Sequence, residues 1–121
     1  MRKLVLLGTL LALAACKPSG SKRLEGHWKG IRAEGVDPSA QANATAFALS
    51  TEIIAQGNQI AVQTQAGRSG PATYVVDKEE GATLVIHTDQ AATETFTFTE
   101  KADQMTWHVD QTQTIVFRRV P

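Results

Sequence analysis

Apolar and polar side chains alternate along most of the chain after residue 23, a spacing that is typical of β-strands with one buried face. The clearest segment is 95–99, where Phe96 and Phe98 alternate with three threonines. Turn residues such as Gly57-Asn58 separate the segments. We expect eight strands, near residues 24–32, 46–53, 60–64, 74–76, 84–86, 95–99, 105–109 and 114–119, and no helix after residue 16.

Short turns between neighbouring strands predict hairpins, and therefore an antiparallel meander. Each strand has one apolar face, and eight such strands cover that face by closing into an up-and-down barrel, which also removes exposed edges. We therefore expect an all-β, eight-stranded antiparallel barrel, with a flattened sandwich as the alternative. Strand parity places these side chains inside: Trp28, Phe47, Leu49, Ile53, Ile60, Val62, Tyr74, Val76, Leu84, Ile86, Phe96, Phe98, Met105, Trp107, Val109, Ile115 and Phe117.

The N-terminus has the pattern of a secretory signal peptide. Arg2 and Lys3 precede an apolar run over residues 4–15. Twelve helical residues reach about 18 Å, which is too short for a hydrocarbon core of about 30 Å. We expect a helical signal peptide over 1–15, a flexible tether over 16–23, which is rich in Pro, Gly, Ser and Lys, and a barrel domain over 24–121.

The apolar run ends in Leu13-Ala14-Ala15-Cys16, which resembles the lipobox of bacterial lipoprotein precursors. The resemblance implies cleavage before Cys16, lipidation of its sulfur, usually acylation of the new N-terminus, and anchoring in a membrane of the cell envelope. Because Lys17 rather than Asp follows the cysteine, it implies the outer membrane, facing the periplasm. An ordinary signal peptide followed by a chance cysteine is the alternative.

Length and charge narrow the classes of protein. The 121 residues allow one domain, and 12 basic against 12 acidic residues argue against nucleic acid as a partner. Cleavage before Cys16 would leave a net charge of −2. A single cysteine excludes an intramolecular disulfide and a cysteine-rich metal site.

Gly26-His27-Trp28 resembles the Gly-x-Trp opening of lipocalins and other calycin-type barrels. The resemblance implies that Trp28 packs at the closed end of the barrel and that a late arginine, Arg119 or Arg118, covers it. The chain is much shorter than true lipocalins, so it is closer to small lipocalin-like lipoproteins.

A meander places strand ends alternately at two rims. We expect the rim that receives the tether to be closed and to face the membrane. A ligand would enter at the far rim, past Arg32, Phe47, Tyr74 and Glu94, under a lid formed by the long connection 33–44. A fully packed core is the alternative, because eight strands enclose little more than their own side chains.

The sequence contains no recognisable arrangement of catalytic residues. His27, His87 and His108 point outward by parity on non-adjacent strands, so we expect no metal site, and no serine has a nucleophile-elbow context. We expect a non-enzymatic envelope lipoprotein without a cofactor, which binds a small apolar or amphipathic ligand or a protein partner. The alternatives are a protease-inhibitor-like barrel, since such inhibitors share a similar Leu-x-Gly-x-Trp start, and a purely structural lipoprotein.

Overall fold

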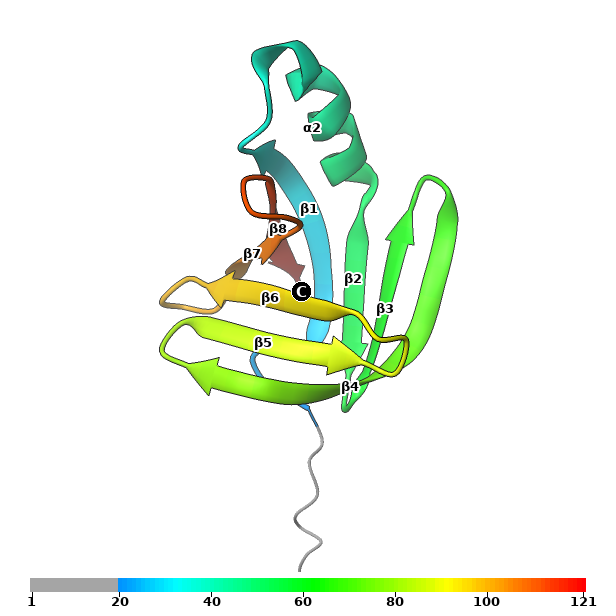
Figure 1. Cartoon of the computed structure of the whole chain (residues 1–121), viewed down its shortest axis with the longest axis vertical. Coiled ribbons are helices and arrows are strands. Elements are labelled where there is room, and N and C mark those ends of the chain that lie inside the picture. Colours follow the sequence, from blue (N-terminus) through cyan, green and yellow to red (C-terminus); the bar gives the residue numbers. More distant parts are fainter. Residues whose placement is uncertain (1–19) are drawn as a thin grey trace, which may run out of the picture.

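The computed structural model describes residues 20–121, which form a closed barrel of eight antiparallel strands in chain order. Each strand pairs with its neighbours in sequence, and β8 closes on β1 (Figure 1). The predicted all-β up-and-down barrel is therefore confirmed. The predicted signal peptide and Cys16 lie outside the described residues. The strands are β1 (Gly26–Glu34), β2 (Glu52–Gln56), β3 (Gln59–Thr64), β4 (Gly67–Glu80), β5 (Thr83–Thr88), β6 (Thr93–Phe98), β7 (Gln104–His108) and β8 (Thr114–Val120).

Strand parity predicted most of the core. Eleven of the side chains expected inside are buried, and Val62, Val76 and Trp107 are partly buried against them. The buried eleven are Trp28, Ile53, Ile60, Tyr74, Leu84, Ile86, Phe96, Phe98, Met105, Ile115 and Phe117.

Three side chains that parity placed inside are exposed, namely Phe47, Leu49 and Val109. Val109 follows the last residue of β7 and belongs to the loop before β8, so the alternation of that strand does not extend to it. Phe47 and Leu49 lie on a helix, which was not expected.

Residues 46–53 were expected to form the second strand, and this prediction was wrong. A 3₁₀ turn, η1 (Pro38–Ala40), leads into helix α2 (Gln41–Ser50), which takes up residues 46–50, and β2 starts only at Glu52. Every second residue from Ala40 to Ala48 is alanine, the best helix former and a poor strand former. The alternation of alanine with larger residues imitates a strand pattern, but alanine propensity favours the helix.

Helix α2 stands at the end of the barrel away from the chain segment that starts at Gly20 (Figure 1). It is attached at its C-terminal end, where Ala48 is buried and the Gly30 N–H donates to the Thr51 carbonyl (2.9 Å). A Cβ at Gly30 would collide with the Ala48 carbonyl, so a glycine is required for the helix to approach β1 this closely.

The 14-residue strand β4 forms a corner of the barrel. Its first half pairs with β3, up to Gln59↔Thr73, and its second half pairs with β5 from Tyr74↔Thr88 onward. In Figure 1, β5 and β6 accordingly run across the direction of β2 and β3. This strand was expected to start at residue 74, which lies at its middle. The β3–β4 register shifts between Ile60 and Val62, as at a bulge, which adds bend to a strand.

Trp28 fills the end of the barrel that receives the N-terminal segment. It is fully buried, and its Nε1–H donates to the Leu24 carbonyl (2.8 Å). The Arg119 guanidinium lies 4.2 Å from the centroid of the indole, and Phe98 meets it edge-on at 5.9 Å. This is the Trp–Arg arrangement expected from the sequence, with Arg119 rather than Arg118 as the partner.

Arg119 also ties the last strand to the segment before the first. It donates to the carbonyls of Arg23 (2.9 Å) and Ala102 (3.2 Å). Gly26 has a φ of +132°, and a Cβ there would meet the guanidinium of Arg119. The glycine of the Gly-x-Trp pattern therefore makes room for the arginine that covers the tryptophan.

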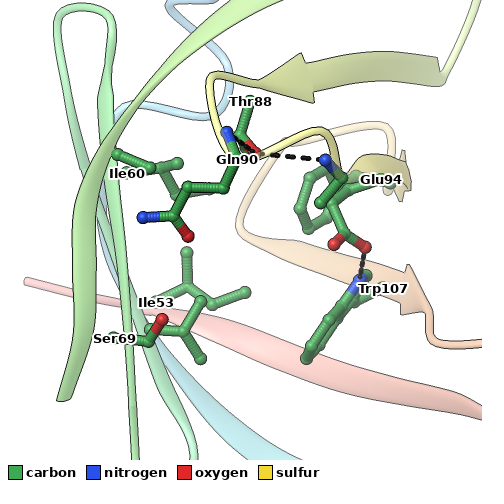
Figure 2. Close-up of a pocket in the computed structure, with 11 residues that line it drawn as sticks. Ile53, Ile60, Ser69, Thr88, Gln90, Glu94 and Trp107 are labelled. Carbon is green, nitrogen blue, oxygen red and sulfur yellow. Dashed lines mark hydrogen bonds between the residues drawn. The ribbon is translucent and has the colours of Figure 1, made fainter.

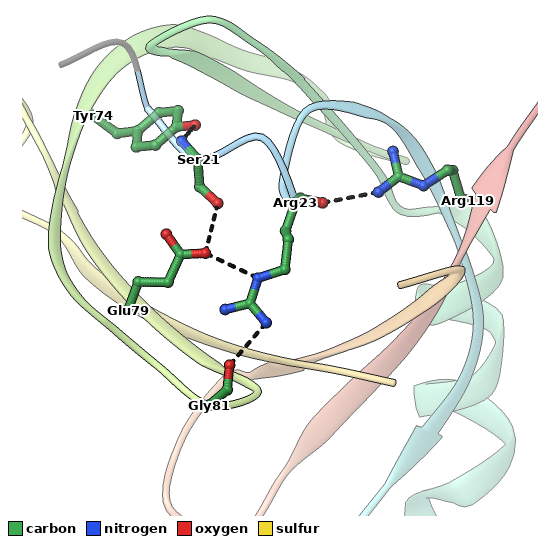
Figure 3. Close-up of polar contacts among 6 residues, drawn as sticks. All are labelled: Ser21, Arg23, Tyr74, Glu79, Gly81 and Arg119. Atoms are coloured by element: carbon green, nitrogen blue, oxygen red, sulfur yellow. Dashed lines mark hydrogen bonds and ion pairs between the residues drawn. The ribbon is translucent and has the colours of Figure 1, made fainter. Parts of the chain in front are cut away.

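Residues 20–23 are packed against this closed end rather than forming part of a flexible tether (Figure 3). Ser21 is buried and its N–H donates to the Tyr74 hydroxyl (2.9 Å). Arg23 pairs with Glu79 (2.9 Å), donates to the Gly81 carbonyl (2.9 Å) and lies 5.0 Å from the centroid of the Phe98 ring. The predicted tether over 16–23 was thus wrong for its last four residues, and residues 16–19 lie outside the described part.

We predict that Trp28→Ala lowers the free energy of unfolding by about 3–5 kcal/mol, because it leaves a cavity and removes the surface on which Arg119 stacks. Urea unfolding followed by circular dichroism measures this loss. Phe47→Ala is the matched control: it removes an exposed ring and should change stability by no more than about 0.5 kcal/mol. Equal losses for the two variants would contradict the structural role assigned to Trp28.

Candidate functional site: a cavity at the open end of the barrel

A partly enclosed cavity of about 150 Å³ lies inside the barrel, between strands β2–β4 on one side and strands β5–β7 with the β5–β6 turn on the other. Most of its wall is apolar, and four polar side chains, Ser69, Thr88, Gln90 and Glu94, line it as well (Figure 2). The complete lining is Ile53, Ile60, Val62, Ser69, Ala72, Thr88, Gln90, Ala92, Glu94, Phe96 and Trp107. Small side chains at Ser69, Ala72 and Ala92 leave the space unfilled.

Glu94 is held in place by an aromatic neighbour. Its Oε1 accepts a hydrogen bond from the Trp107 Nε1–H (2.9 Å), across the β6–β7 pair. The other carboxylate oxygen points toward the cavity in Figure 2. Glu94 belongs to the inward-facing set of β6 together with Phe96 and Phe98, two and four residues further on.

The β5–β6 turn carries Gln90 to the cavity. The Thr88 hydroxyl accepts from the N–H groups of Gln90 (3.2 Å) and Ala92 (3.4 Å), and the Thr88 N–H donates to the Ala92 carbonyl (2.9 Å). Ala91 has a φ of +64°, which closes this tight turn. The Gln90 side chain consequently extends toward Ile60 and the cavity (Figure 2).

Of the four residues expected at the ligand entrance, Glu94 alone lines this cavity. Arg32 is exposed on β1 and pairs with Glu34 (2.8 Å), and Phe47 lies on α2. Arg32 precedes the buried Ala33 and faces solvent, and Phe47 lies on a helix outside the barrel instead of on the expected strand, so neither reaches the cavity (Figure 1).

Tyr74 belongs to the closed end, so its assignment to the entrance was wrong. Its side chain is almost fully buried. Its hydroxyl accepts a hydrogen bond from the Ser21 N–H and donates one to the Gly57 carbonyl (3.1 Å). Burial raises the pKa of its hydroxyl above 10.0; the Ser21 N–H lowers it in part, and the nearby carboxylates of Glu25 and Glu79 raise it further.

A second, more open cleft of about 320 Å³ lies between α2 and the β7–β8 loop. Its lining carries no charge and includes Val36, Ala44, Phe47, Val109 and Ile115. The loop is shaped by Asp110, whose Oδ1 accepts from two backbone N–H groups of the same loop, at residues 112 (2.9 Å) and 113 (2.8 Å). These bonds lower the pKa of the Asp110 carboxyl.

The histidines lie apart from the cavity and from one another. His27 pairs with Glu52, His87 with Asp77 (2.6 Å), and His108 with the Thr97 hydroxyl (2.8 Å). Within residues 20–121, no three His, Cys, Asp or Glu side chains converge as metal ligands. In the same part of the chain, no helix has the length and apolar character needed to cross a bilayer.

Comparison with known proteins found neither a protein family whose model matches the chain nor a curated protein with a matching sequence. The site is therefore interpreted from its own residues.

The sequence analysis missed Ser69 and Gln90 and saw Trp107 only as a core residue. Ser69 and Gln90 both fall in stretches that were interpreted as turns, where polar residues are ordinary and carry no signal. The sequence did contain one signal for a charge inside the barrel. Glu94 lies between two threonines and two residues before Phe96, so it falls on the inward face of the strand.

We predict that the hydroxyl of Tyr74 ionises at higher pH in the native protein than in urea. The folded pKa is raised, so the stabilising contribution is complete below pH 10 and is lost as the pH rises through the folded pKa. Tyr74 is the single tyrosine of the chain, so tyrosinate absorbance near 295 nm reports this group alone. Coincident native and unfolded titrations would show that the hydroxyl is not buried.

Proposed function

We propose that this chain is a non-enzymatic, lipid-anchored lipoprotein of the bacterial cell envelope whose barrel binds a small amphipathic ligand. The observation that carries the proposal is a mostly apolar cavity inside the barrel, which is lined by side chains from β2 to β7 and by none from residues 20–25, the segment that leads back to Cys16. Because this segment does not line the cavity, an anchor at Cys16 leaves the cavity accessible from the aqueous side.

The packing of residues 20–23 supports a short connection to the membrane. Cys16 precedes Gly20 by four residues, which span at most about 14 Å. Acyl chains on Cys16 would therefore hold the closed end near the lipid headgroups. Two or three acyl chains suffice for stable anchoring, whereas a single chain binds membranes marginally. Lys17 favours the outer membrane, with the barrel in the periplasm.

The size of the cavity restricts the ligand. A cavity of about 150 Å³ in another protein holds a molecule the size of benzene. The cavity of this barrel has the same volume, so it suits a compact apolar body with a polar group, and it is too small for a whole fatty-acid chain. One ionisable side chain, Glu94, lines it among the described residues, which supports binding rather than acid–base catalysis by a pair of groups.

A protein partner is the second candidate, and the surface of α2 favours it. Phe47 and Leu49 on the helix and Val109 in the facing loop are each more than two-fifths exposed. Phe47 and Val109 line the uncharged cleft between α2 and the β7–β8 loop. Exposed aromatic and aliphatic side chains around an apolar groove are typical of protein contact surfaces.

We predict that Cys16→Ala abolishes membrane association, because it removes the thiol that would carry the lipid, while the barrel remains folded. Fractionation of expressing cells should move the protein out of the membrane pellet, and metabolic labelling with a palmitate analogue should lose its signal. Lys17→Ala, which keeps the thiol, serves as the control and should stay in the pellet. A Cys16→Ala protein that still sediments with membranes would contradict lipid anchoring.

We predict that Ala92→Phe blocks the cavity from the β5–β6 turn, whereas Ala82→Phe, in the β4–β5 turn at the opposite end, does not. Benzyl alcohol, a neutral probe matched to the cavity, should shift the Nε1–H NMR resonance of Trp107 in the wild type and in Ala82→Phe, and bind at least tenfold more weakly to Ala92→Phe. The Trp28 indole resonance, from the closed end, should not move. If no variant responds, the purely structural lipoprotein becomes the better interpretation.

A further inference from the structure

We infer that the cavity selects ligands that carry a positive charge beside their apolar body, and that small primary ammonium compounds are the class it takes. This rests on the proposed function, that the cavity is the binding site. Three features of the cavity support it: an unpaired carboxylate, aromatic walls and polar side chains without partners.

The carboxylate of Glu94 is the first feature. It faces a mostly apolar cavity, and among residues 20–121 no lysine, arginine or histidine forms an ion pair with it. One oxygen accepts from Trp107, and the other points toward the cavity (Figure 2). A carboxylate oxygen can accept further hydrogen bonds, and those from a cationic donor are the strongest.

The hydrogen bond from Trp107 keeps this carboxylate oriented before a ligand arrives. Its indole also forms part of the cavity wall, next to Phe96 on the neighbouring strand. An ammonium group near aromatic faces is attracted by the negative face of the ring. The same wall therefore contacts the apolar body of a ligand and favours a cation beside it.

Ser69 and Gln90 supply the remaining acceptors. Both side chains line the cavity where it opens to solvent, and within the described part of the chain neither makes a side-chain hydrogen bond to the protein, so both are free to bond a ligand. An ammonium group has three N–H donors, which the Glu94 carboxylate, the Gln90 amide oxygen and the Ser69 hydroxyl can accept between them. A carboxylate ligand, in contrast, would bring a like charge against Glu94, so anionic amphiphiles are disfavoured.

Three probes of nearly equal size test the selection: benzylammonium, benzyl alcohol and benzoate. Each is titrated into the full-length protein in phosphatidylcholine nanodiscs at 0.15 M salt, with the Trp107 Nε1–H resonance as the signal and that of Trp28 as the internal control. We expect benzylammonium to bind at least tenfold more tightly than benzyl alcohol, and benzoate to bind most weakly.

The Glu94→Gln variant tests the negative charge of the side chain separately from its hydrogen bond to Trp107. The glutamine keeps the size and an oxygen that can accept from Trp107, so benzyl alcohol should bind within about threefold of the wild type, while the preference for benzylammonium disappears. Glu80→Gln removes a carboxylate at the closed end and should leave all three affinities unchanged.

The outcomes distinguish this inference from the proposed function. Equal affinities for the three probes, or a preference for benzoate, would overturn the cation selectivity and leave ligand binding in the cavity intact. A preference for benzylammonium that persists in Glu94→Gln would also overturn it. If no probe shifts the Trp107 resonance in the wild type, the proposed binding function itself fails.

Discussion

The contact between Arg119 and Trp28 is the interaction on which the rest of this barrel depends. It joins the first and the last strand, which are paired in the closed barrel but are 91 residues apart in the chain. The loss of chain entropy on closing so long a loop has to be offset by contacts at the seam. Arg119 provides these contacts at one place. Its guanidinium stacks on the buried indole of Trp28 and donates hydrogen bonds to three separate backbone carbonyls.

The closed end and the cavity differ in how their polar groups are bonded. At the closed end, polar groups find protein partners: Tyr74 binds Ser21 and Gly57, and Arg23 binds Glu79 and Gly81. Beside the cavity, Thr88 bonds the backbone of the β5–β6 turn, and the side chains of Gln90 and Glu94 are left facing the cavity. The cavity therefore keeps polar side chains that a ligand can reach.

The sequence predicted the fold class and the closed end, because both depend on local alternation and on a short pattern around Trp28. It predicted the helix α2 and the entrance poorly, for two physical reasons. Alternating alanines look like a strand in a binary pattern, although their propensity is helical. The position of Tyr74 depends on β4 continuing through Gly70-Pro71 and bending at the corner of the barrel. The alternation of apolar and polar residues does not show which end of the barrel a residue in such a long, bent strand lies near.

The cavity itself follows from that corner. Near Ala72 the strand β4 changes partner from β3 to β5, and the walls on either side separate. Ser69, Ala72 and Ala92 are too small to fill the gap, whereas at the closed end Trp28, Phe98 and Tyr74 fill the space between the strands. Parity assigns a side chain to the inside of a barrel but does not compare its volume with the space available, so neither the existence nor the size of the cavity could be read from the pattern. What the sequence does fix is that one of the few inward charges, Glu94, stands at the beginning of β6, beside the place where the space remains.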